Sequence, residues 1–257
     1  MTYCLGIRVA SGLVFAADSR TNAGVDSVST YRKVFVFSRP GDRVIVVLTA
    51  GNLAITQEVI SMIDRGLATD DESRSLAKAP SMIDVARLIG SFLRVVFDRD
   101  GDYFKAHGSE FRASFILGGQ IHGEPHRLFM IYAAGNFIEV SEDAPYFQLG
   151  ETKYGKPILE RVLTSKVSLL DTAKCALVSF DSTIKANISV APPIDLVIYK
   201  ADTFHIATHQ RVRDNDPYFN ALCRHWAEGL RRLFAEAPDP PWEMDGETDP
   251  IVQLGHR

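Results

Sequence analysis

The first eighteen residues constrain the fold of this chain more than any other stretch, because they predict a hairpin that begins at the second residue. One face of the first strand is apolar and contains every second residue, Tyr3, Leu5, Ile7 and Val9. A tight turn at Ser11-Gly12 leads into a returning strand at 13–17. The hairpin ends at Asp18, so we expect Asp18 to lie close to Thr2.

Thr2 would carry both a hydroxyl and a free α-amino group once Met1 is removed. Removal of the initiator methionine requires a small second residue, and threonine is small. A threonine hydroxyl is a weak nucleophile, and a neighbouring α-amine can act as the base that activates it. A sheet that ties down the terminus would hold both groups in place. The alternative is that Thr2 is an ordinary residue of an edge strand, and short motifs alone do not exclude it.

Composition and charge narrow the class of protein. The 257 residues are 46% hydrophobic and 23% charged, which is typical of a soluble chain and is enough for one large domain. We expect a single domain over residues 2–236, followed at 237–257 by an acidic, proline-rich tail that is flexible or docks on a partner. The net charge of −4 and the pI near 6.0 argue against nucleic acid as a partner.

Apolar runs and cysteine usage indicate the cellular compartment. No apolar run approaches the roughly 20 residues of a membrane span, and the alternating start lacks the pattern of a signal peptide, so we expect no membrane partner. The cysteines are odd in number and far apart, at Cys4, Cys175 and Cys223. That usage is typical of a reducing compartment, and we expect the cytoplasm.

Hydrophobic periodicity predicts strands, two helices, more strands, two helices, a hairpin and a last helix. Strands are predicted at 3–9, 13–17, 31–37, 43–50, 112–119, 127–132, 136–140, 194–200 and 203–209, and helices at 53–67, 81–96, 154–163, 168–184 and 218–235. Ser81 and Ser168 have the positions of helix N-caps. The strands at 31–37 and 43–50 are apolar on both faces, so each sheet needs a cover on both sides. The predicted fold class is α+β, a four-layer α/β/β/α sandwich of two mainly antiparallel sheets.

Four separated features together resemble the proteasome β-subunit family of N-terminal nucleophile hydrolases. They are Thr2 at the start, Asp18-Ser19-Arg20 after the second strand, Lys33 before the third and Ala50-Gly51 at the end of the fourth. Within that family, the stretches at 2–4, 18–26 and 149–156 most resemble the Anbu branch. The resemblance covers roughly residues 2–235 by the same order of elements.

The resemblance implies a role for each matching residue. Thr2 matches the nucleophile, Asp18 the acid that orients the site, Lys33 the cation that polarises the nucleophile and Gly51 the backbone N–H donor of the oxyanion hole. The chemistry agrees, because a lysine on a buried strand needs a partner such as Asp18, and glycine lets a peptide approach the backbone. Taken singly, Lys33 and Asp18 could equally be a structural ion pair and Gly51 a plain turn from strand to helix.

Further residues are assigned less directly. We expect Ser19 and Arg20 to support Asp18. Order along the chain assigns the wall of a substrate pocket to Tyr31, Phe35, Thr49 and Leu53, which favours an apolar side chain before the cleaved bond. One departure concerns positions where many family members have two serines and an aspartate. Here those regions contain Glu151 and Ser189, and Ala186 takes the place of the aspartate.

These residues predict a threonine peptidase that hydrolyses peptide bonds and needs no cofactor. The expected partners are a peptide or protein substrate, further copies of the chain in a ring-like or open spiral oligomer, and an unidentified ATPase or adaptor. Assembly would leave helix positions such as Phe92 and Leu93 outside the core. We expect no metal, since Gly123 and Pro125 separate His122 from His126 in a turn. Two alternatives stay open, an amidase or small-peptide hydrolase on the same fold and a catalytically weak assembly protein.

Overall fold

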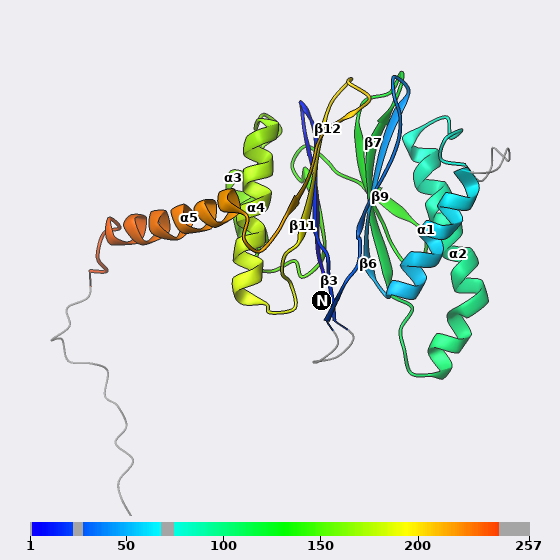
Figure 1. Ribbon diagram of the computed structural model, residues 1–257, viewed down its shortest axis with the longest axis horizontal. Coiled ribbons are helices and arrows are strands. Elements are labelled where there is room, and N and C mark those ends of the chain that lie inside the picture. The colour runs from blue at the N-terminus through cyan, green and yellow to red at the C-terminus, as the bar shows by residue number, and fades with distance from the viewer. Residues whose placement is uncertain (1, 23–27, 68–74, 242–257) are drawn as a thin grey trace, which may run out of the picture.

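The computed structural model describes residues 2–22, 28–67 and 75–241, and their elements form four layers. Figure 1 shows two sheets packed face to face, with helices on the outer side of each sheet. This arrangement confirms the predicted α/β/β/α sandwich. Met1, residues 23–27 and 68–74, and most of the predicted tail, 242–257, lie outside the described residues.

The first sheet, here called sheet I, contains the N-terminal hairpin at its centre. Its strand order is β10 (Tyr146–Gly150), β1 (Tyr3–Val9), β2 (Gly12–Asp18), β11 (Ile194–Lys200) and β12 (Ile206–Val212), with every neighbouring pair antiparallel. Cys4 lies opposite Ala17 and Val9 opposite Gly12, so the predicted hairpin is confirmed. Gly12 has φ +147, and a Cβ there would overlap the carbonyl oxygen of Tyr199 in β11.

The second sheet, sheet II, is a meander. Its strands follow chain order as β5 (Val34–Arg39), β6 (Arg43–Gly51), β7 (Ala113–Ile121), β8 (Arg127–Ile131) and β9 (Phe137–Glu139). A short separate hairpin consists of β3 (Arg20–Asn22) and β4 (Val28–Thr30). The first six strands are therefore divided among sheet I, this hairpin and sheet II. Asp18 ends β2 of sheet I, and Lys33 directly precedes β5 of sheet II.

The helices supply the outer layers. They are α1 (Leu53–Leu67) and α2 (Met82–Ala106) beside sheet II, α3 (Lys156–Val162) and α4 (Leu169–Ala186) beside sheet I, and α5 (Pro217–Ala235), which projects away from the body in Figure 1. The predicted N-caps are confirmed, because the hydroxyls of Ser81 and Ser168 accept hydrogen bonds from the third residue beyond them. No helix in the described ranges combines the length and apolar character needed to cross a membrane.

Three apolar clusters hold the layers together. Phe15, Leu48 and Ile116 are fully buried in the cluster between the sheets. Leu5 and Phe180 belong to the cluster on the α4 side of sheet I. Phe92 and Leu93 are buried in the cluster under α1 and α2, so the expectation that assembly leaves them outside the core is wrong.

Some predicted elements need correction. The third predicted strand begins at Val34 rather than Tyr31, and only Val34 of β5 is buried, so it is not buried on both faces. The short strands β3, β4 and β10 were not predicted. β10 has only five residues and pairs with β1, so its strand geometry comes from a partner far away in the sequence. α2 continues to Ala106, well beyond its last buried apolar residue, Val96.

Candidate active site

A fully buried carboxylate lies beside the start of the chain. Asp18 ends β2, and its Oδ1 accepts hydrogen bonds from the Tyr3 amide at 2.8 Å and from the Lys33 ammonium at 2.9 Å. Its Oδ2 is buried and has no hydrogen-bond partner in the described part of the chain. Burial raises the pKa of Asp18, and the Lys33 charge and the Tyr3 amide oppose that rise. Asp18 therefore fixes the backbone next to Thr2 and holds Lys33 in place.

Lys33 is the cationic member of this site and is only 5% exposed. Its Nζ also donates to the carbonyl of Arg20 at 2.6 Å, and its own carbonyl accepts from the Thr49 amide at 3.0 Å. A buried ammonium is expensive unless its hydrogen bonds are satisfied, and here a carboxylate and a carbonyl satisfy two of them. The sequence-predicted pair of Lys33 and Asp18 is thus present as a buried ion pair.

Thr2 lies immediately before β1 and is partly exposed. Its carbonyl accepts a hydrogen bond from the Glu151 amide at 2.7 Å, which continues the ladder between β1 and β10 by one residue. Because side chains alternate along a strand, Thr2 lies on the same side as Cys4, which faces the other sheet. The structure therefore brings Thr2 together with Asp18 and Lys33 at one end of the sandwich.

Gly51 lies at the end of β6, where the chain passes into α1. It has φ +110, and a Cβ there would overlap the carbonyl oxygen of Arg112. The backbone therefore requires glycine at this turn for its own geometry, whatever its part in chemistry. Its assignment as the oxyanion donor stays a prediction.

Ser19 and Arg20 contact Asp18 only indirectly. The Ser19 hydroxyl donates to Asp195 Oδ2 at 3.0 Å, and Asp195 in turn accepts from the Arg211 guanidinium at 3.0 and 3.1 Å. Arg20 reaches Asp18 through its carbonyl, which binds Lys33, whereas its guanidinium donates to the Ile188 carbonyl at 3.1 Å. Asp195 and Arg211 were not predicted, although a carboxylate inside the apolar run at 194–199 was a signal of a buried partner.

Glu151 and Ser189 meet through a residue that the sequence analysis did not assign to the site. Glu151 is 9% exposed, and its Oε2 accepts from Asn187 Nδ2 at 3.0 Å. The Asn187 side-chain oxygen accepts from the Ser189 amide at 2.9 Å. Asn187 thereby joins the end of β10 to the segment that follows α4, and only the folded backbone reveals this link.

The four predicted pocket residues do not form one wall. Tyr31 is 40% exposed and Thr49 is buried. Phe35 packs against the cluster under α1 and α2, so it points away from the side that Thr2 shares with Cys4. Leu53 is partly buried as the first residue of α1. Their role as a substrate pocket stays a prediction.

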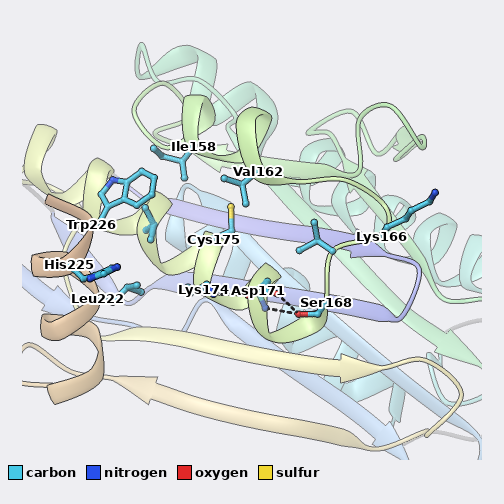
Figure 2. A pocket seen from close by; sticks show the side chains of 12 residues that line it. Ile158, Val162, Lys166, Ser168, Asp171, Lys174, Cys175, Leu222, His225 and Trp226 are labelled. Atoms are coloured by element: carbon cyan, nitrogen blue, oxygen red, sulfur yellow. Dashed lines mark hydrogen bonds and ion pairs between the residues drawn. The ribbon is translucent and has the colours of Figure 1, made fainter. Parts of the chain in front are cut away.

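A cavity of about 770 Å³ lies in a different place, among α3, α4 and α5. Figure 2 shows Ile158 and Val162 from α3, Cys175 from α4, and Trp226 from α5 around it. None of the sequence-predicted site residues lines it. Cys175 is also 4% exposed in the cluster beside sheet I. The cavity is therefore separate from the Thr2 site.

Comparisons with solved structures identify close relatives. Anbu from Hyphomicrobium sp. strain MC1, as its Gly-1 mutant, is 48% identical over 93% of this chain and 99% of its own, with a TM-score of 0.87. Anbu, the ancestral β-subunit, from Yersinia bercovieri is 45% identical over 94% and 99%, with a TM-score of 0.86. Anbu from Pseudomonas aeruginosa, in a structure described as the helical assembly of the Anbu complex, is 46% identical over 93% and 98%, with a TM-score of 0.87.

No protein-family model and no curated protein matches the chain. The three structural relatives nevertheless share nearly half of its residues over more than nine tenths of its length. The TM-scores of 0.86 and 0.87 show that the three relatives also have the same fold. The chain therefore belongs to the Anbu family of proteasome-like ancestral β-subunits.

Proposed function

We propose that this chain is an N-terminal threonine peptidase that works as a homo-oligomer. The observation that carries the proposal is the contact of one buried carboxylate with both the Tyr3 amide and the Lys33 ammonium, directly beside Thr2. Such a pair holds a positive charge close to the place where a threonine oxygen would become negative. Membership of the proteasome-like Anbu family supports the same reaction class.

The mechanism follows from these residues. After removal of Met1, the Thr2 hydroxyl oxygen attacks the substrate carbonyl carbon, and its proton passes to the α-amine, directly or through water. The Lys33 ammonium favours the developing alkoxide, and the Gly51 N–H donates to the oxyanion. The C–N bond then breaks, and the leaving amine takes the proton. Water hydrolyses the acyl-Thr2 ester and restores the free hydroxyl.

Exposed apolar residues support assembly. Among the described residues of α5 only Phe219 is buried, whereas Leu230, Leu233 and Phe234 are 49%, 61% and 84% exposed. An amphipathic helix with its apolar residues in water favours contact with another chain. The Pseudomonas aeruginosa relative forms a helical assembly, and we infer a comparable open oligomer here. The three free thiols favour a reducing compartment such as the cytoplasm.

Intact mass spectrometry of protein from its native cytoplasm tests the proposal. We expect loss of Met1 and one covalent adduct after incubation with an epoxyketone or a β-lactone. Thr2→Ala should abolish the adduct, whereas Thr208→Ala, at an exposed threonine of β12, should retain it. A retained Met1 without an adduct would contradict the proposal and favour the assembly protein. A panel of peptides and simple amides then separates a peptidase from an amidase.

A further inference from the structure

Glu151 is a buried carboxylate directly beside Thr2. Its amide donates to the Thr2 carbonyl at 2.7 Å, and its side chain is almost excluded from water. Gly150, with φ +81, turns the chain against Thr2, because a Cβ there would overlap the Thr2 carbonyl. The backbone thus brings the Glu151 side chain to the terminus and keeps it there.

The carboxylate of Glu151 has no cationic partner in the described ranges. Its two oxygens accept from the Asn187 side chain at 3.0 Å and from the Lys153 backbone amide at 3.3 Å, and both donors are neutral. Every salt bridge of the described residues involves other carboxylates, including that of Asp18. Burial of an ionised carboxylate without a positive charge is unfavourable, and proteins normally pair it.

The charged groups around Thr2 leave one negative charge uncompensated. Asp18 from β2 and Glu151 after β10 are acidic, and Lys33 before β5 is basic and already bound to Asp18. The Arg20 guanidinium is directed to the Ile188 carbonyl. The segment at 187–193 after α4 and the turn at 51–52 after β6 contain no ionisable side chain. Two carboxylates therefore face one ammonium at the start of the chain.

We propose that Glu151 is the counter-ion of the α-ammonium group that Thr2 carries once Met1 is removed. This inference rests on the proposed function, since it assigns a partner to the same terminus. Asn187 acts with Glu151 as a positioning residue, because its amide fixes the carboxylate and its oxygen holds the Ser189 amide. The retained Met1 would move the ammonium one residue away from this partner.

The counter-ion has a consequence for the pH at which the site works. A carboxylate within a few ångströms stabilises the protonated amine, and opposite charges at such distances raise the pKa of an amine by about 1–3. An unperturbed α-amine has a pKa of about 7.7–8.0. The amine that must accept the Thr2 proton is then neutral only in alkaline solution, so acylation of Thr2 should increase with pH beyond pH 8.

The test compares three forms of the full-length protein after mass spectrometry has established loss of Met1. Glu151→Gln removes the charge and keeps the size and an amide that can hydrogen bond to Asn187. Glu142→Gln, at an exposed carboxylate before β10, is the matched control. The readout is the pKa of the Thr2 α-amine, followed by the 15N shift of threonine-labelled protein. The pH dependence of inactivation by the epoxyketone is measured in parallel.

We expect Glu151→Gln to lower the amine pKa by about one or more, and to move the inactivation profile to lower pH by the same interval, whereas Glu142→Gln changes neither. An unchanged amine pKa in Glu151→Gln would overturn the proposed role of Glu151 as counter-ion, even if the protein remains an active peptidase. If Glu151→Gln does not fold, Glu151→Asp and Asn187→Ala test the same point, because each displaces the charge and should lower the pKa less. A chain that retains Met1 refutes the proposed function and, with it, this inference.

Discussion

Removal of the Lys33 charge should destabilise the protein much more than removal of an exposed lysine. Lys33→Met keeps most of the side-chain volume but leaves Asp18 as a fully buried carboxylate without its cation. At 2.9 Å, two unit charges attract by about 6 kcal/mol at an effective dielectric constant of 20. Desolvation offsets part of this, and removal of one partner of a buried pair costs about 3–5 kcal/mol of the free energy of unfolding.

The matched control is the ion pair of Lys174 with Asp171. Its atoms are closer, at 2.6 Å, but its side chains are 51% and 54% exposed, so water screens the attraction. Urea denaturation gives the loss in free energy of unfolding for each variant. Both are measured at one fixed protein concentration, because assembly makes stability concentration-dependent. Lys174→Met should leave the midpoint nearly unchanged. Equal effects of the two substitutions would refute the claim that burial makes the Lys33 pair strong.

The pH dependence of this loss has a definite sign. Burial raises the pKa of Asp18, and loss of Lys33 removes the largest opposing influence on that pKa. A carboxyl whose folded-state pKa lies above its unfolded value of about 3.9 favours the folded protein when protonated, and this contribution is lost as pH rises through the folded pKa. The free energy of unfolding of Lys33→Met should therefore be closest to that of the wild type in acid, and the difference between the two should grow as pH increases. The double variant Asp18→Asn with Lys33→Met should lose that pH dependence.

Three further predictions concern the rest of the molecule. Burial raises the pKa of the Cys175 and Cys223 thiols to about 12. Iodoacetamide at pH 8 should therefore alkylate these thiols roughly a thousandfold more slowly in the folded protein than in the protein unfolded in urea, as followed by mass spectrometry. Equal alkylation rates in the two states would contradict this prediction. Gly12→Ala should unfold the hairpin, because a Cβ there overlaps backbone atoms of β11. Gly229→Ala, in open space on α5, should raise the free energy of unfolding by about 0.5–1 kcal/mol. Thermal melting distinguishes these effects, because the first variant should melt at a lower temperature than the wild type and the second at a higher one. Ser168→Ala should lower the free energy of unfolding by about 1 kcal/mol through loss of the α4 cap, and an unchanged urea midpoint would contradict this.

Local patterns predicted the parts of the fold that depend on neighbours in sequence. The alternation at 3–9, the turn at Gly12 and the two serine caps each follow from a few adjacent residues, and the structure confirms them. β10 was missed because only its pairing with β1 makes it a strand. The ion pair of Asp195 with Arg211 was missed for a related reason, since it depends on the register of β11 against β12.

The candidate site likewise contains residues that the sequence indicated and residues that only the folded chain reveals. Thr2, Asp18 and Lys33 were assigned through a resemblance of separated motifs, and in the folded chain Asp18 binds both Lys33 and the amide of Tyr3, the residue after Thr2. Asn187 was not assigned to the site, because nothing in its local sequence indicates that it binds a side chain 36 residues earlier in the chain. The face that Phe35 occupies was not predictable, because chain order does not state which side of a strand a residue lies on.

The position of β1 inside sheet I also affects the order in which the two sheets can be completed during synthesis of the chain. Sheet II uses only strands between residues 34 and 139, so all of its pairs are available while the ribosome is still making the rest of the chain. The hairpin of β1 and β2 lacks its neighbour on one side until β10 is made and on the other until β11 is made, and β11 begins at Ile194. Glu151, Asn187 and Asp195 arrive with those late segments. A truncated nascent chain therefore contains Thr2 but not the late segments that surround it in the folded protein, so the candidate site is complete only after β11 has been made.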